Sequence, residues 1–320
     1  MAVWKIAVVL VGVLAAGAAQ AADYPTKPVR MIVPLAMGGG SDIVGRIVAV
    51  ALADHWGQPV VVDNRPGAGS TLGTSIAVKA APDGYTLLVS SSSMAISPAL
   101  YKKLPFDVLR DFAPVTLIAS QPSILAVHGA VNARTVPELI ALAKAQPGML
   151  AYGSAGTGSA THLGSELFKY AAGIDLLHVP YKSAGLATSA LLAGEVQLLV
   201  TNMASVLPHI KSGRVRALGI TSLQRSPIAP DVPTVAESGL PKFEYATWYG
   251  MLVPARTPSA IVTRIQTAIA KVLGAPQVRE RLSQQGLEVL ATSSGEFGRY
   301  LAEEVARWQT VVKAAGITVE

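Results

Sequence analysis

The chain has 320 residues, of which 51% are hydrophobic and 14% charged, and it has no cysteine, so it contains neither a disulfide nor a lipidated N-terminal cysteine. This length exceeds what one hydrophobic core usually organises, and we expect two lobes. The formal net charge is +6 at pH 7, but the basic residues are dispersed, which argues against nucleic acid as a partner and favours encounter with small anions.

Residues 1–21 have the pattern of a secretory signal peptide. Lys5 precedes an apolar stretch at 6–19, and Ala19 and Ala21 supply the small residues of a cleavage site. No later stretch reaches the roughly 18 consecutive apolar residues that a membrane span requires. We therefore expect this segment to be removed on export and the mature protein to be soluble and periplasmic.

The next segment reads as a buried strand, a glycine loop and the start of a helix. The apolar run at 32–35 predicts the strand, Gly38, Gly39 and Gly40 form the loop, and apolar residues at helical spacing begin at Ile43. Ser41 or Asp42 can cap this helix, whose free N–H groups point out of the loop. The segment is either a cradle for a carboxylate or phosphate or an ordinary tight turn between a strand and a helix.

The same strand–loop–helix pattern is repeated twice more in the first third of the chain. A strand at 60–62 leads into a glycine loop at 63–71, and a strand at 85–89 ends in a serine run that contains Ser91. Arg65 in the second loop can pair with a ligand carboxylate or hold its own loop together. Strands that alternate with helices predict a doubly wound, mostly parallel sheet with ligands at the carboxyl ends of its strands.

A second glycine-rich cradle is predicted in the middle of the chain. Strands at 112–119 and 124–128 carry the chain into the second lobe near Gln121, and a helix at 135–145 precedes a strand at 149–152. The loop after that strand contains the candidate ligand residues Ser154, Ala155, Gly156, Thr157, Gly158 and Ser159. His162, in the first turn of the following helix, faces a ligand or has a structural role. Tyr181 and Asn202 are candidates because they follow the strands predicted at 176–179 and 196–200.

The rest of the sequence returns the chain to the first lobe. A strand at 215–220 and a proline-containing connector at 226–241 precede a strand at 245–253 and two helices, which begin near 257 and 293. We expect lobe 1 to comprise residues 22–122 and 243–320, and lobe 2 to comprise residues 123–242.

The residue spacings match no motif of catalysis, cofactor binding or metal binding. The glycine clusters lack the third glycine of a dinucleotide fingerprint, and Ser159 stands where a P-loop requires lysine. The sequence has no nucleophile elbow, and its five histidines have no ligand spacing. We therefore expect no catalytic residue, cofactor or metal. A secreted hydrolase that uses Ser154 or Ser159 with His162 is a weak alternative, because no orienting acid is apparent.

Several motifs in the same order resemble a known family over essentially the whole mature chain. They are VVVDNRPGAG at 60–69, PDGYTLL at 82–88, YGSAGTGS at 152–159, DVPTVAE at 231–237 and the helix that contains Trp308. They are similar to the Bug-type receptors, the extracytoplasmic substrate-binding proteins of tripartite tricarboxylate transporters. The resemblance implies a type II periplasmic binding protein of the α/β class, with two lobes joined by a hinge of two crossovers.

The resemblance also implies where a ligand binds and what the protein does with it. It places a carboxylate between Gly38 to Asp42 of the first loop and Ser154 to Ser159 of the second, with His162 close by. Met37 stands where the family often has proline, and Gln197 where many members have an acidic residue, so both affect the expected specificity. We expect a monomer that captures a small organic acid for the membrane permease subunits; a receptor of the same fold that contacts a signalling partner is the alternative.

Overall fold

The computed structural model describes residues 24–227, 229–314 and 316–317. The predicted signal peptide lies outside these residues. Within the described part, none of the helices has both the length and the apolar character needed to cross a bilayer.

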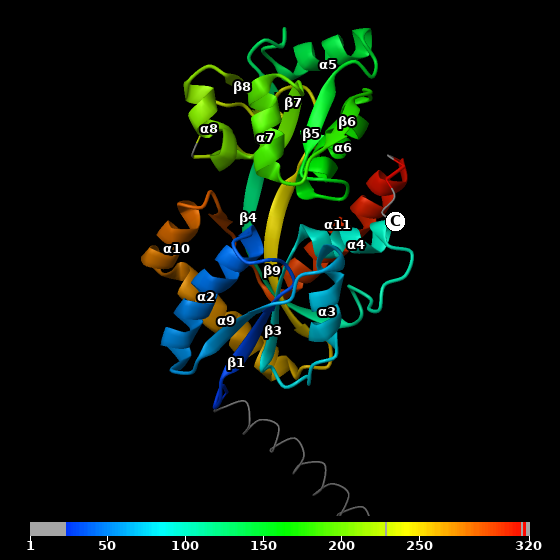
Figure 1. Cartoon of the computed structure of the whole chain (residues 1–320). Helices are drawn as coiled ribbons and strands as arrows, with labels where there is room; N and C mark the ends of the chain where they lie inside the picture. The colour runs from blue at the N-terminus through cyan, green and yellow to red at the C-terminus, as the bar shows by residue number, and fades with distance from the viewer. Residues whose placement is uncertain (1–23, 228, 315, 318–320) are drawn as a thin grey trace, which may run out of the picture.

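Two lobes lie one above the other, and two long strands run between them (Figure 1). The first lobe contains β1 (Val29–Val33), α2 (Gly40–Trp56), β2 (Val60–Asn64), the 3-10 turn η1 (Ala68–Ser70), α3 (Thr71–Val78), β3 (Thr86–Ser91), α4 (Ser92–Leu100), α9 (Ser259–Gly274), α10 (Pro276–Ser283), β10 (Glu288–Val289) and α11 (Ser294–Ala314). The second lobe contains α5 (Val136–Ala145), β5 (Ala151–Ser154), α6 (Ala160–Ala172), β6 (Leu177–Pro180), α7 (Ala184–Ala193), β7 (Leu198–Asn202), α8 (Met203–Lys211) and β8 (Val215–Ile220). The connecting strands are β4 (Phe112–His128) and β9 (Ala246–Pro254).

In each lobe, all but one of the main strands point in the same direction. β1 pairs in parallel with both β2 and β3, and β9 runs antiparallel between β3 and β4. In the second lobe β5 pairs in parallel with β6 and β7, and β4 is antiparallel to β7 and β8. The predicted α/β architecture with two mostly parallel sheets and two crossovers is therefore confirmed.

One continuous strand occupies the place where the sequence predicted two. β4 is 17 residues long: it pairs with β9 up to Pro122, and from Ser123 onward it pairs with β7. The change of partner thus falls at Pro122, which has no N–H to donate to either neighbour. The chain therefore passes between the lobes as an unbroken strand.

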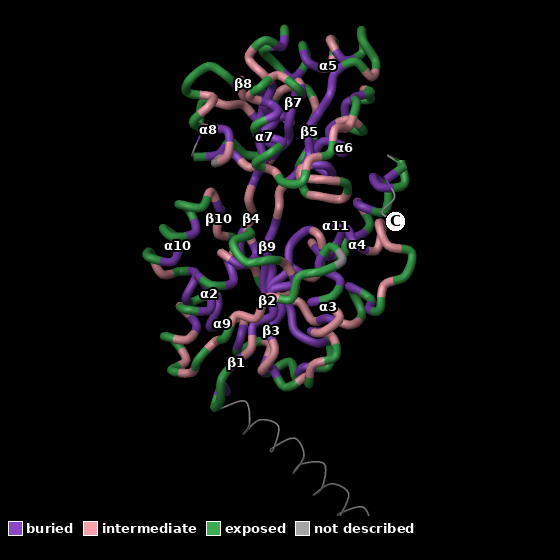
Figure 2. The backbone as a smooth tube through the Cα atoms, viewed as in Figure 1, coloured by how far each residue is buried: buried purple, intermediate pink, exposed green. Residues whose placement is uncertain are grey.

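The buried strands form the centre of each lobe, with helices on both faces (Figure 2). In the first lobe α2, α9 and α10 pack on one face, and α3, α4 and α11 on the other. In the second lobe α5 and α6 cover one face, and α7 and α8 the other. The interior residues that form these faces are almost all aliphatic or aromatic, which accounts for the folding of the chain without disulfides.

The C-terminal helix joins the two cores. Phe297 and Leu301, in the first half of α11, pack in the core of the first lobe, whereas Trp308 and Val312 pack in the core that contains α5 and α6. Helix α4 does the same, because Met94 lies in the first-lobe core and Ile96 in the second-lobe core. The lobes are therefore connected by two packed helices as well as by two strands.

Candidate functional site

Two cavities lie side by side where the lobes meet, and four residues belong to the walls of both. One has a volume of about 430 Å³ and is lined by five serines, which are Ser41, Ser91, Ser92, Ser93 and Ser159; we call it the serine chamber. The other has a volume of about 450 Å³ and is lined by Gln121, Asn202 and Gln285 among others; we call it the amide chamber. The shared wall consists of Gly40, Ala160, Thr247 and Tyr249.

Most of the candidate ligand residues line one of these chambers. Those in the serine chamber are Gly40, Ser41, Ser91, Thr157, Gly158 and Ser159. Those in the amide chamber are Gly38, Gly39, Gly40, Ala155 and Asn202. The structure thus brings the two predicted glycine loops, which are more than 100 residues apart in the sequence, to opposite sides of one cleft. Contact of these residues with a ligand stays a prediction.

Three helices begin at the wall of the serine chamber. Helix α2 starts at Gly40, α4 at Ser92 and α6 at Ala160, and all three residues line the chamber. Neither Gly39 nor Ser91, the cap residues of α2 and α4, makes a side-chain capping hydrogen bond. The first N–H groups of these two helices are therefore available to an anion, and three positive dipole ends converge there.

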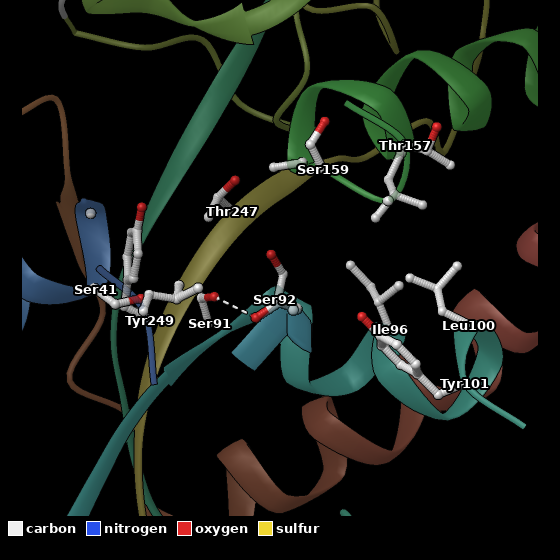
Figure 3. A pocket seen from close by; sticks show the side chains of 17 residues that line it. Ser41, Ser91, Ser92, Ile96, Leu100, Tyr101, Thr157, Ser159, Thr247 and Tyr249 are labelled. Carbon is white, nitrogen blue, oxygen red and sulfur yellow. Dashed lines mark hydrogen bonds between the residues drawn. The ribbon is translucent and has the colours of Figure 1, made fainter. Parts of the chain in front are cut away.

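A buried hydroxyl without a partner points to the same place. Ser41 is 1% exposed, and its Oγ has no hydrogen-bond partner among the described residues. Figure 3 shows Ser41 beside Tyr249 and Ser91 at one end of the serine chamber. Because an unsatisfied buried hydroxyl is unfavourable, this arrangement favours a polar ligand atom within reach of Ser41.

None of the described residues that line the two chambers carries a charged side chain. Backbone N–H groups, hydroxyls and, in the amide chamber, side-chain amides are therefore the donors available to an anion there. No group of three or more potential metal-ligating side chains occurs in the described part of the chain.

Asp42 lies outside both chamber walls and stabilises the first glycine loop. Its carboxylate accepts hydrogen bonds from the Gly38 N–H at 2.9 Å, from Arg46 Nε at 3.0 Å and from Asn64 Nδ2 at 3.0 Å. Burial alone would raise the pKa of Asp42, but the hydrogen bonds from Arg46, Gly38 and Asn64 hold it below its ordinary value. The carboxylate fixes the loop, which leaves the Gly40 end of α2 free to face the cleft.

The second loop is held in a similar way by two stacked histidines. His162 Nδ1 accepts a hydrogen bond from the Gly158 N–H at 3.1 Å, and its ring stacks on His178 with a centroid separation of 4.2 Å. Ser154 is fully buried, and its Oγ lies 2.6 Å from His178 Nε2 while accepting from the Gly156 N–H at 3.1 Å. Ser154 and His162 therefore lie behind the loop, Gly156 lines neither chamber, and the serine that pairs with a histidine is buried away from the cleft.

The remaining candidates have local partners. The Tyr181 hydroxyl donates to the Glu195 carboxylate at 3.3 Å, and Tyr181 lines neither chamber. Arg65 forms an ion pair with Asp63, so it holds its own loop together, which is one of the two roles that the sequence left open. Gln197 accepts from the Ala151 N–H at 2.8 Å, so it supports β5.

Acidification should destabilise the folded protein through His162, which supports the second loop. Burial, followed by the neighbouring His178, lowers the pKa of His162 from 6.5 to about 4. Between these pH values the His162 side chain is protonated in the unfolded chain but not in the folded chain. The free energy of unfolding should therefore fall as pH drops from about 6.5 to about 4, and His162 should account for at most about 3 kcal/mol of this loss. Urea unfolding across this range measures the slope. His162→Asn, whose Oδ1 can still accept from Gly158, should flatten it, whereas His55→Asn at an exposed position should leave it unchanged; an unaltered slope in His162→Asn contradicts the prediction.

The sequence missed the residues that α4 and β9 contribute to the serine chamber. These are Ser92, Ser93, Ile96, Leu100, Tyr101, Thr247 and Tyr249. The run of serines that ends β3 and the internal Pro98 concealed helix α4. Pro98 cannot donate to the Met94 carbonyl, but the Ser97 hydroxyl does so at 2.9 Å, which lets the helix continue.

Comparison with known proteins agrees with this geometry. A family profile described as "Tripartite tricarboxylate transporter family receptor" matches residues 44–317. Protein BugT of Bordetella pertussis is 38% identical over 316 residues, which cover 97% of each chain. The structure of R. palustris Rpa4515 with adipate has a TM-score of 0.78 at 34% identity, covering 92% of this chain and all of that one. MatC from Rhodopseudomonas palustris with bound malate has a TM-score of 0.75 at 32% identity, covering 90% and 100%.

Proposed function

The chain belongs to the family of tripartite tricarboxylate transporter receptors, and from this we propose that its ligand is a small carboxylate. Members of this family are solute-binding receptors rather than enzymes. The protein binds a small organic acid between its lobes, with the ligand carboxylate in the serine chamber at the start of α2. The similar structures that hold adipate and malate support a carboxylate as the ligand.

The buried hydroxyl of Ser41 is the observation that carries this proposal. It lies without a partner at the start of α2, and Ser159 at the start of α6 lines the same chamber from the other lobe. A carboxylate placed between them accepts hydrogen bonds from both lobes, which stabilises the closed arrangement relative to an open one. In a cavity without charged side chains, these donors offset the loss of hydration of the anion.

Ligand binding is tested with a panel of small mono- and dicarboxylates in a thermal-shift screen, followed by titration calorimetry. A specific carboxylate should raise the midpoint of unfolding, because it binds the folded chain alone. The amides of the same acids, which are neutral, should give no shift. Failure of every acid to bind would overturn the proposal.

Removal of the Ser41 hydroxyl should weaken binding without weakening the fold. In Ser41→Ala the carboxylate loses one hydrogen bond to a charged group, which corresponds to about 1.5–3 kcal/mol, or about 10- to 100-fold in Kd. Since Ser41 Oγ has no partner among the described residues, the unliganded variant should be at least as stable as the wild type. The matched control is Ser90→Ala, because Ser90 is also fully buried with an Oγ that has no partner among the described residues, but it lines neither chamber; this variant should keep the affinity. Equal Kd values for Ser41→Ala and wild type would contradict the role of this hydroxyl.

The receptor operates in the periplasm after export through a cleaved signal peptide, and it delivers its ligand to the membrane permease subunits of a tripartite transporter. The family assignment supports this step. Deletion of the gene should abolish uptake of the identified acid, and a plasmid copy should restore it. Normal uptake together with loss of an inducible response would indicate a signalling role instead.

A further inference from the structure

The serine chamber has a polar end and an apolar end. Ser41, Ser91 and Ser92 lie toward one end, and Ile96 and Leu100 of α4, with its cap residue Tyr101, lie toward the other (Figure 3). Leu163 of α6 also lines the chamber. Ile96 and Leu163 are each 1% exposed, so they offer a fixed apolar surface, while Leu100 is only partly buried.

The apolar end has no charged side chain to replace the hydration of a second carboxylate, and its side-chain donors are the neutral hydroxyls of Tyr101 and, from the other lobe, Thr157 (Figure 3). The Tyr101 hydroxyl is directed toward Gly69, where an added Cβ would lie only 3.4 Å from Tyr101 Cζ and closer still to its oxygen. The helix N-termini that face the chamber belong to Gly40, Ser92 and Ala160. A carboxylate moved toward Leu100 would leave the N-termini of α2 and α4 and approach apolar side chains.

Several polar groups of the amide chamber have partners within the protein. Gln121 Nε2 donates to the Gln285 carbonyl at 3.1 Å, and Gln121 Oε1 accepts from the Tyr249 hydroxyl at 3.4 Å. Asn202 Oδ1 accepts from the Ser205 N–H at 3.0 Å as the cap of α8. A carboxylate that reached Gln121 would have to break one of its pairs, whereas a carboxylate in the serine chamber meets a free hydroxyl at Ser41.

We propose that the ligand is a monocarboxylate with an apolar body, either a chain of about six carbons or a phenyl ring, which lies against Ile96, Leu100 and Leu163. This inference rests on the proposed function, because it places the carboxylate at the start of α2. Burial of the apolar body adds affinity in proportion to the area removed from water. Cavities of this volume are of the size that small-molecule ligands occupy.

The first test compares acids of equal length by titration calorimetry on the mature wild-type protein. Hexanoate and adipate have the same carbon chain and differ in the second carboxylate. Hexanoate, and likewise 3-phenylpropionate, should bind at least tenfold more tightly than adipate. Equal or tighter binding of adipate would overturn this inference and leave the proposed function intact, whereas failure of all three acids and of the wider panel would overturn both.

The second test reverses the preference at a half-buried position. Leu100→Lys places an ammonium at the apolar end, and its long side chain can reach solvent if the fold requires it. The ratio of adipate to hexanoate affinity should rise at least tenfold. Leu109→Lys, which adds the same charge at an exposed leucine outside both chambers, should preserve the wild-type preference. An unchanged ratio in a folded Leu100→Lys protein would show that the ligand body does not lie there.

Discussion

Gly40→Ala should reduce ligand affinity by about 100-fold while the protein remains folded. A Cβ on Gly40 would lie 2.6 Å from Tyr249 Cζ and closer still to the Tyr249 hydroxyl oxygen. The ring, which belongs to β9 and forms the wall between the two chambers, must therefore move. Overpacking of this kind is unfavourable by about 1–3 kcal/mol, and here the displaced ring also enters the space of the ligand. Titration calorimetry measures the loss.

The neighbouring glycine separates this effect from a general disturbance of the loop. Gly39 has an extended backbone with φ −80°, and an added Cβ would meet only the Ala36 carbonyl at 3.5 Å. Gly39→Ala should therefore lose far less affinity, within about fivefold. Alanine at a helix N-cap is less stable than glycine by only about 1 kcal/mol. A Gly40→Ala protein that binds like the wild type would show that the ligand does not reach the start of α2.

Local sequence patterns identified both glycine loops because the chemistry of a loop is contained in a few adjacent residues. Each loop follows a strand and precedes a helix, and the two loops, Gly38 to Gly40 and Thr157 to Ser159, line opposite sides of the cleft. The same patterns could not decide whether Asp42 and His162 face a ligand or their own loop. That choice depends on partners distant in the sequence, such as Asn64 and His178.

The apolar end of the serine chamber was not predictable from the sequence for a different reason. It requires helix α4, whose continuation past Pro98 depends on a hydroxyl–carbonyl hydrogen bond that a propensity scale does not contain. It also requires the register of β9 against β4, in which Thr247 pairs with Gln121 and Trp248 with Ser120. A strand with alternating aromatic residues indicates burial, but it does not say which of them faces the cleft.

A buried carboxylate bridges the cores of the two lobes, and Glu304→Ala should lower the free energy of unfolding by about 3–5 kcal/mol. Glu304 of α11 is 3% exposed and accepts hydrogen bonds from the indole N–H groups of Trp248 and Trp308, each at 3.2 Å. Arg307 Nη2 lies 2.6 Å from the other carboxylate oxygen of Glu304. Alanine leaves two indole donors and a guanidinium without this partner at the place where hinge strand β9 meets α11. Urea unfolding at pH 7 measures the loss.

Two variants and the pH dependence isolate the charge of Glu304 from its packing. Glu304→Gln keeps an acceptor for the indoles and should be less unfavourable than alanine, and Glu303→Ala, at an exposed position on the same helix, should be nearly neutral.

Burial raises the pKa of Glu304 above 4.5, so the folded chain retains its proton to a higher pH than the unfolded chain does. The stability that this residue contributes is therefore fully present below 4.5 and declines as pH rises through the folded pKa, opposite in sign to the effect of His162. Glu304→Gln should remove this decline, and its persistence in that variant would assign the pH dependence to another group.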